Sequence, residues 1–394
     1  MEEIVILSAA RTAIGKYGKA LSGIKVTELG ATAIGEAVKR AKLAPADIEE
    51  CIMGNVISTG LGQNPARQSA VGAGLPMEIG SYTVNDVCGS GLKAAMNAAD
   101  AIKAGEYNVI VAGGMESMSN IPYYVDGARW GFKMNDQIMT DTMVHDGLWD
   151  AFNDYHMIQT ADNICADPRY ALTREELDDF ALQSQLKAEK AQNSGAFDKE
   201  IVPVSVKQKK NVIIFDKDEN PRAGSTIEGL TKLRPINQDG FVTAGNASSI
   251  NDGAAAVVVM SEEKAKELGV TPMATWIAGA LTGVDPAVMG IGPVAATKKV
   301  MAKTGMKIND FDIIEANEAF AAQALAVGRD LGIDMDKQLN PGGGAIALGH
   351  PVGASGCRIL VTLLHAMEAK DAKTGLATLC IGGGMGVAAV VSRD

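Results

Sequence analysis

Residues 340–356 read NPGGGAIALGHPVGASG and contain His350, one of four histidines in the chain. So many glycines are costly in a regular helix or strand, because each loses more conformational entropy on folding than other residues do. They are typical of places where the backbone passes close to another backbone or to a ligand. Two other stretches are also rich in glycine: residues 84–93 (VNDVCGSGLK) and residues 379–386 (LCIGGGMG). Two cysteines and a histidine in glycine-rich turns predict one reactive site assembled from distant segments.

The chain also resembles itself at long range. Residues 47–55 (DIEECIMGN) resemble residues 309–317 (NDFDIIEAN), which aligns Asn55 with Asn317, 262 positions away (317 − 55). Cys88 and His350 have the same spacing (350 − 88). Further similar pairs are Gly89–Lys93 with Ala354–Arg358, and Gly113–Met115 with Gly383–Met385. Such recurrence is typical of a diverged duplication and predicts two similar α/β halves.

Hydrophobic periodicity predicts alternating strands and helices in both halves. Asn64 with Pro65 and Thr173 with Glu176 are typical helix starts. Between residues 120 and 247 the periodicity is patchy, which predicts an inserted, partly irregular domain. The expected domains are therefore 1–119 with 248–271, the insertion 120–247, and 272–394. The expected strands are 4–7, 48–57, 82–84, 109–112 (closed by Gly113-Gly114), 254–260 and 275–278, and the expected helices are 27–41, 64–73, 92–104, 173–191 and 294–304.

The composition excludes several classes of function. The chain has 394 residues and a net charge of −11 with a pI near 5.0, which argues against nucleic acid as a partner. An anionic ligand would need local positive charge, for which residues 207–210 and 222–234 are the candidates. Five cysteines in no paired spacing, and no C-x-x-C, indicate free thiols and no zinc site. The sequence has no signal peptide and no membrane-spanning run, so a cytoplasmic protein is expected.

Cys88 and His350 are the first candidates for chemistry. Cys88 precedes an expected helix, whose positive end favours a thiolate, and the following glycines free N–H groups for an oxyanion. An imidazole such as that of His350 can take the proton of a nearby thiol. The alternatives are a buried structural cysteine and a hydrogen-bonded core histidine.

Cys380 and Asn317 are the second pair of candidates. A thiol in a glycine turn, like that of Cys380, suits proton transfer, because its ordinary pKa near ~8.5 is easily tuned. The amide of Asn317 could hold a water or an oxyanion. The alternative for Cys380 is a buried structural cysteine, and the alternative for Asn317 is a helix cap. The remaining cysteines (Cys51, Cys165, Cys357) and histidines (His145, His365) are expected to be core or surface residues.

Together these stretches resemble the thiolase family over essentially the whole chain, from Ser8–Thr12 to Cys380–Gly384. Three motifs carry the resemblance: Asn85–Gly91, Asn317–Phe320 and Gly349–Pro351 with its glycines. Within the family, the chain most resembles the short-chain acetoacetyl-CoA thiolases (acetyl-CoA acetyltransferases). The resemblance implies a duplicated thiolase fold with a layered αβαβα core.

The resemblance also implies roles for these residues. Cys88 would carry the acyl group as a thioester, and His350 would activate it and polarise the thioester oxygen beside a water on Asn317. Cys380 would remove a proton from the second acetyl-CoA. The N–H groups of Cys88 and Gly382 would form a second oxyanion hole.

The insertion would bind coenzyme A, and the resemblance places several residues at the acyl and pantetheine sites. His156 and Met157 would narrow the acyl pocket, as in the short-chain members. The family's usual glycine after Ser248 is here Ser249, which puts the local backbone in question. Residues 119–140 would be an arm that joins dimers into a homotetramer, or else a mobile lid. The implied substrate and coenzyme A contacts are Leu148, His156, Met157, Arg222, Ala244, Ser248, Met289, Ala319 and Phe320.

The sequence thus predicts reversible Claisen condensation of two acetyl-CoA to acetoacetyl-CoA plus CoA, with coenzyme A thioesters as substrates and no bound cofactor or metal. One alternative is a broader-chain 3-ketoacyl-CoA thiolase. A decarboxylating ketoacyl synthase would typically have a second histidine in place of Asn317. A non-catalytic acyl-CoA or lipid carrier predicts a degraded Cys88 or His350, whereas both are intact. A Cys-His peptidase has no supporting motif.

Overall fold

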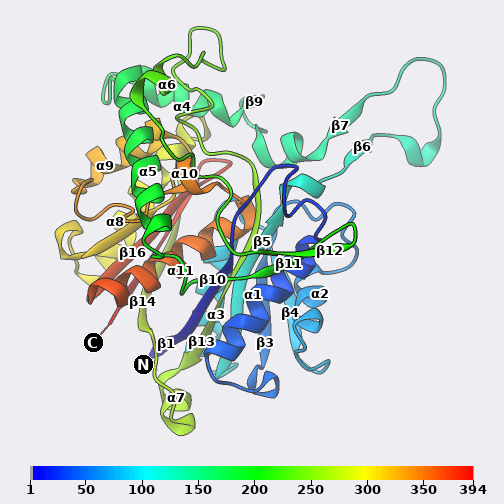
Figure 1. The fold of residues 1–394 in the computed structure, drawn as a ribbon, viewed down its shortest axis with the longest axis vertical. Helices are drawn as coiled ribbons and strands as arrows, with labels where there is room; N and C mark the ends of the chain where they lie inside the picture. Colours follow the sequence, from blue (N-terminus) through cyan, green and yellow to red (C-terminus); the bar gives the residue numbers. More distant parts are fainter. Residues whose placement is uncertain (1–2, 394) are drawn as a thin grey trace.

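The computed structural model describes residues 3–393, so residues 1, 2 and 394 of the expected terminal halves lie outside the described chain. One mixed sheet forms the body, in the order β15-β16-β17-β14-β1-β13-β5-β3-β4, with β10 beside β1 and β2 beside β13 (Figure 1). Its strands are β1 (Ile4–Thr12), β2 (Gly15–Lys16), β3 (Glu50–Gly54), β4 (Gly80–Val84), β5 (Val109–Ser117), β10 (Ile201–Val202), β13 (Asn251–Ser261), β14 (Ala274–Gly283), β15 (Ile313–Ala316), β16 (Thr374–Ile381) and β17 (Met385–Ser392). The helices are α1 (Val26–Arg40), α2 (Pro65–Gly72), α3 (Ser90–Lys103), α4 (Met157–Ala166), α5 (Arg174–Asn193), α6 (Ile227–Thr231), α7 (Glu262–Leu268), α8 (Gly292–Thr304), α9 (Ala321–Leu331), α10 (Ala345–Leu348) and α11 (Val352–Lys370).

Five layers follow from the way the strands divide their side chains between separate cores. In β1, Ile4 and Ile6 join a central core, whereas Val5 and Leu7 join an outer core under α1 and α2. This is the two-residue alternation of a strand buried on both faces. The central core contains α3, α11 and strands of both halves, and a third core packs α8 and α9 on the second half. The layers are therefore α1/α2, the first half-sheet, α3/α11, the second half-sheet and α8/α9, as the expected αβαβα core requires.

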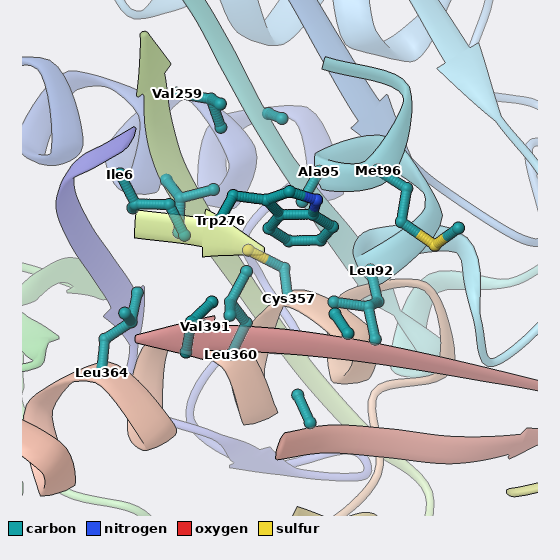
Figure 2. Packing of buried hydrophobic residues seen from close by; sticks show 14 of the residues in the cluster. Ile6, Leu92, Ala95, Met96, Val259, Trp276, Cys357, Leu360, Leu364 and Val391 are labelled. Carbon is teal, nitrogen blue, oxygen red and sulfur yellow. The ribbon is translucent and has the colours of Figure 1, made fainter. Parts of the chain in front are cut away.

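Trp276 of β14 lies at the centre of the central core, only 6% exposed. Figure 2 shows its indole ring between the two central helices and the strands of both halves. Around it lie Leu92, Ala95 and Met96 of α3, Cys357 and Leu360 of α11, and Ile6, Val259 and Val391 of the sheet.

The two halves meet where β1 and β14 pair antiparallel through Ile4–Ile6 and Ala274–Trp276. Each of these strands has a register shift at the matching place. In β1 it lies between Ile6 and Ser8, where β1 pairs with β13, and in β14 it lies between Trp276 and Ala278, where β14 pairs with β17. A bulge repeated at matching positions is the mark of a duplicated unit, because bulges are specific features of a strand pair. The predicted duplication is thus visible in the backbone.

The predicted register of the repeat is wrong by one residue for the strands that precede the active-site loops. Asp47 accepts the N–H of Ala44 in the first half, and Asp310 accepts that of Lys307 in the second. These aspartates end matching 3₁₀ turns and are 263 positions apart (310 − 47), not 262. By this register the partner of Asn317 is Gly54 rather than Asn55.

The glutamate and aspartate at the start of these strands confirm the corrected register. Glu49 accepts the N–H groups of Asn108 and Val109, and Asp312 accepts those of Lys373 and Thr374. Their spacing is again 263 (312 − 49). The two segments were aligned one residue out of register because both end in asparagine, Asn55 and Asn317.

The prediction that Gly113 and Gly114 end their strand is wrong, because β5 continues to Ser117. Added Cβ atoms at the two positions would lie 2.1 Å from the carbonyl oxygens of Ala255 and Gly353, respectively. These glycines admit neighbouring backbone inside a strand instead of ending it. Their suggested counterparts, Gly383 and Gly384, have φ of +83° and +81° and form the turn between β16 and β17. The similarity between these two glycine pairs is therefore coincidental.

The other expected helices and strands are present, mostly with longer ends. Asn64 accepts the N–H of Arg67 at the start of α2, with Pro65 as the first helical residue. Thr173 and Glu176 form the predicted capping box of α5. These starts were correct because capping depends on side chains only three residues apart.

The insertion between β5 and β13 contains α4, α5, α6 and small two-stranded sheets. A hairpin of β6 and β7 extends away from the body as a long arm, seen at the upper right of Figure 1. Within residues 3–393 no helix has the length and apolar character needed to cross a membrane. In the same range no group of three or more His, Cys, Asp or Glu side chains is placed to hold a metal ion. The small sheets are β6 (Tyr123–Val125) with β7 (Met139–Asp141), β8 (Trp149–Asp150) with β9 (Tyr155–His156), and β11 (Val204–Gln208) with β12 (Asn211–Phe215).

We expect Gly114→Ala to destabilise the protein by about 3 kcal/mol, because the new methyl group would meet the backbone of Gly353 and Gly91. The matched control is Gly35→Ala in α1, where the nearest atom would be 3.9 Å away and the change should stabilise by up to about 1 kcal/mol. Urea unfolding of both variants measures the difference. Equal midpoints for the two would contradict the close backbone contact.

Candidate active site

Two of the candidate stretches meet where β4 leads into α3 and β16 into its following turn. Cys88 lies between β4 and α3, and the N–H of Gly382 in the turn after β16 is close enough to lower the pKa of its thiol. Cys380, the penultimate residue of β16, is close enough for the charge of Cys88 to raise the pKa of its thiol. The structure therefore brings Cys88, Cys380 and Gly382 into one site.

The Cys88 thiol is protonated at neutral pH, contrary to the expectation of a thiolate. Burial raises the pKa of this thiol to about 11, and the carboxylates of Asp86 and Glu116 raise it as well. The N–H groups of Gly382 and of Cys88 itself oppose this shift but do not cancel it. For this sulfur to act as a nucleophile, a base would have to remove its proton.

His350 has the form that such a base needs. Its Nδ1 lies 2.6 Å from Ser355 Oγ, whose hydroxyl donates to the carbonyl of Pro351 at 2.9 Å. Because that hydroxyl has only one hydrogen, it accepts the Nδ1–H of His350, and Nε2 retains the lone pair. Burial lowers the pKa of the imidazole to about 3, so the ring is neutral at physiological pH. Nε2 is buried and has no hydrogen-bond partner within the described chain.

Asn317 is fully buried, and neither atom of its amide has a partner among residues 3–393. Buried polar atoms without partners are rare and typical of a ligand or water site. The alternative of a helix cap is wrong, because α9 begins only at Ala321 after Phe320. The amide is therefore available to a polar atom of a substrate or to a water.

Cys380 is fully buried. Burial and the neighbouring Cys88 both raise the pKa of its thiol. Cys51, Cys165 and Cys357 are buried free thiols, as expected, and of the two remaining histidines His145 is exposed and His365 largely buried.

Glu116 was not identified from the sequence. It is buried at the end of β5 and accepts the N–H groups of Val56, Ile57 and Gly353 and an amide hydrogen of Asn55. Burial raises the pKa of its carboxyl to about 7, although these donors favour the charged form. Glu116 thus ties the first half to the start of α11. Ser355 was also missed, because serine at this spacing from a histidine forms no recognised motif.

The residues implied for the acyl end of the substrate lie beside the two cysteines. Met157, Met289, Ala319 and Phe320 share one apolar cluster with Cys380. The Met157 sulfur is 3.9 Å from the position that a Cβ on Gly382 would occupy.

Leu148 packs in a second apolar cluster that includes Cys88. It ends a π-helical turn (Met143–Leu148), a conformation that is rare except at functional sites. His156 caps α4 by accepting the N–H of Ile158 at Nδ1, and burial lowers the pKa of its ring.

The TAGNAS motif (residues 243–248) runs beside the loop after β15. Ser248 N–H donates to the carbonyl of Ala319 at 2.9 Å, and Ala247 bridges to Phe320. Ala244 and Arg222 lie outside both apolar clusters, exposed on the insertion. Ser249 does not have a positive φ, so its replacement of the family's glycine causes no backbone strain.

Comparison with known proteins agrees with this geometry. The family model described as "Thiolase, N-terminal domain" matches residues 4–263, and "Thiolase, C-terminal domain" matches residues 270–393. The chain is 55% identical to the acetyl-CoA acetyltransferase of Cupriavidus necator and 54% identical to that of Escherichia coli, with 100% of each chain covered. It is similar to the crystal structure of the Bacillus anthracis acetyl-CoA acetyltransferase (TM-score 0.97, 43% identity, 100% of this chain and 99% of that one). The Syntrophomonas wolfei acetyl-CoA acetyltransferase structure gives a TM-score of 0.97 at 41% identity, with both chains fully covered.

We expect the rate of Cys88 alkylation by iodoacetamide to rise with pH through pH 9, about tenfold per unit, without a plateau near neutrality. The reason is that alkylation requires the thiolate, and the pKa of this thiol is raised to about 11. Mass spectrometry of the Cys88 peptide gives the rate, and the other four cysteines, all buried, serve as internal controls. A plateau below pH 8 would show that the resting sulfur is a thiolate.

Proposed function

Since the chain belongs to the thiolase family, we propose that it is an acetyl-CoA C-acetyltransferase, an acyltransferase that interconverts two acetyl-CoA with acetoacetyl-CoA and CoA. The observation that carries this proposal is that Cys88 is close enough to Gly382 and Cys380 for their interactions to shift the pKa of the two thiols, and the buried, unpartnered His350 Nε2 and Asn317 amide support it. These are the nucleophile, the bases and the oxyanion donors that a Claisen condensation through an acyl-enzyme needs.

The first half-reaction transfers the acetyl group to Cys88. His350 Nε2 takes the thiol proton as the sulfur attacks the thioester carbonyl carbon. The resulting oxyanion is stabilised by the imidazolium N–H and by a water held on Asn317. The carbon–sulfur bond to CoA then breaks, and the imidazolium returns its proton to the CoA sulfur. The low pKa of His350 favours this return, because the buried imidazolium is a strong acid.

The second half-reaction forms the carbon–carbon bond. His350 Nε2, neutral again after the first half-reaction, takes the proton of the Cys380 thiol. The Cys380 thiolate then takes a proton from the methyl group of a second acetyl-CoA, and the enolate carbon attacks the acetyl carbonyl on Cys88. The oxyanion is stabilised by the N–H groups of Cys88 and Gly382 and collapses by releasing the Cys88 sulfur, which receives the proton held by His350.

The insertion would hold the coenzyme A part of both substrates. Ser248 donates its N–H to Ala319, and Ala247 bridges to Phe320, which lies in one apolar cluster with Met289; this supports a pantetheine channel there. We assign the exposed Arg222 and Ala244 to the nucleotide end, where charge and backbone must stay accessible. With the domains taken as 1–119 plus 248–271, 120–247 and 272–394, this channel lies between the insertion and the C-terminal half. Five free thiols fit a cytoplasmic enzyme.

We expect thiolysis of acetoacetyl-CoA to exceed that of 3-ketohexanoyl-CoA and 3-ketooctanoyl-CoA by at least about tenfold, because Met157 crowds the acyl end at Gly382. Cys88→Ala should abolish all three activities. Met157→Ala should raise activity on the six-carbon substrate relative to the four-carbon one. Comparable wild-type rates on all chain lengths would favour the broader 3-ketoacyl-CoA thiolase. Coenzyme A binding without turnover of any substrate would favour the carrier.

We propose that the arm of residues 119–140 joins two dimers into a tetramer. The arm extends from the body (Figure 1). It exposes large apolar side chains: Trp130 is 87% and Met134 89% exposed. Apolar side chains exposed to this degree on an extended hairpin favour contact with another subunit. The same arm would act as a lid only if it reached its own active site.

We expect the double change Trp130→Ser with Met134→Ser to convert tetramers into dimers, because it removes the apolar surface of the arm. Light scattering after size-exclusion chromatography gives the mass. The matched control is Lys133→Ser, a polar change in the same arm, which should leave the tetramer intact. An unchanged mass in the double variant would contradict the role of the arm.

A further inference from the structure

Asn251, the first residue of β13, is fully buried against the turn that carries His350. Its Oδ1 accepts the backbone N–H of His350 at 2.9 Å, and its Nδ2 donates to the carbonyl of Gly15 at 3.0 Å. The amide is thus held at both ends, and its orientation is fixed. The catalytic turn and strand β13 are joined directly, although they are about a hundred residues apart.

Gly349, in the same turn, lies in close contact with the Asn251 amide. Its φ is +104°, and an added Cβ would lie 2.5 Å from both Cγ and Oδ1 of Asn251. Only glycine allows this approach and this backbone conformation. The position of the His350 backbone is therefore defined by contact with Asn251.

Ser249 supports the same amide from its other side. Its Oγ lies 2.8 Å from Asn251 Oδ1 and 2.8 Å from Oδ1 of Asn220. Asn220 is also buried and donates through Nδ2 to the carbonyl of Ala347 at 2.8 Å. One hydroxyl thus lies between two amides, and each of them holds a different point of the segment that leads into His350.

We propose that Ser249 and Asn251 are positioning residues for His350, a role that deepens and rests on the proposed function. Asn251 fixes the backbone of His350, while Ser355 fixes Nδ1 of the ring, so Nε2 is aimed by two independent hydrogen bonds. The single hydroxyl hydrogen of Ser249 can be donated to the amide oxygen of Asn220 or to that of Asn251, both 2.8 Å away, so Ser249 links the two amides. The serine that departs from the family's glycine is therefore part of the support of the base.

The test compares Ser249→Ala and Ser249→Gly with Ser249→Thr, which keeps a hydroxyl, and with Ser22→Ala, a turn serine whose Oγ donates only to Lys19. For both variants without a hydroxyl we expect kcat for acetoacetyl-CoA thiolysis to fall about tenfold with KM within about twofold, since a slightly misplaced base slows chemistry more than binding. Ser249→Thr should recover most of the loss, and Ser22→Ala should behave as wild type. Two hydroxyl-free variants are used so that a folding defect in one leaves the other informative.

A second measurement needs no substrate. Amide hydrogen exchange of a peptide covering residues 345–352 should become at least about fivefold faster in Ser249→Ala, because the His350 N–H loses part of its support. An unchanged kcat, or a change in KM alone, would overturn the inference, as would unchanged exchange with lowered kcat. Absence of wild-type thiolysis would defeat the proposed function, whereas the exchange result would still decide whether Ser249 holds the turn.

Discussion

The central helices α3 and α11 touch backbone to backbone, and this contact sets the distance between the reacting segments. An added Cβ on Gly91 would lie 2.7 Å from the amide nitrogen of Cys357, and one on Gly356 would lie 2.5 Å from that of Leu92. Both contacts occur within the first two turns of the helices, directly after Cys88 and His350. Because the interior is close-packed, the starts of the two helices, and with them Cys88 and His350, are held at a fixed separation.

The same burial decides the charge state of the site. It raises the pKa of both thiols and lowers that of His350, so all three groups are neutral at rest. A neutral site avoids the cost of holding unpaired charge in a low-dielectric interior. Under the proposed mechanism, the reaction would then begin with a proton transfer, and the direction of His350 Nε2 would matter more than a preformed thiolate. The hydrogen bonds that Ser355 and Asn251 make to His350 agree with that requirement.

The sequence allowed good predictions wherever the determining residues are close in the chain. Capping at Thr173 and the apolar period of α1 depend on neighbours a few residues apart, and both predictions were correct. Gly113 was taken for the end of a strand because a glycine pair is a common turn signal, whereas its reason is the backbone of a partner strand far along the chain. The expectation of a thiolate at Cys88 missed for a related reason: the helix dipole is local, whereas the pKa of this thiol is raised mainly by burial under segments that are distant in the sequence. The bond from Asn251 to His350 spans 99 residues and leaves no local pattern.

The corrected repeat register shows how the two halves of the duplicated fold differ at the ends of their matching strands. The pairing of β5 with β13 and of β16 with β17 matches Met115 to Cys380 and Glu116 to Ile381. In the first half, Glu116 occupies the loop after β3 by binding its N–H groups and side-chain amide. In the second half Ile381 stands at the position of Glu116 and has no carboxylate. By the corrected register Asn317 matches Gly54, which has no side chain, and the Asn317 amide has no partner among the described residues. The two halves therefore differ at two matched positions: the first half has a buried carboxylate that binds its own loop, and the second half has a buried amide that is free to bind another group.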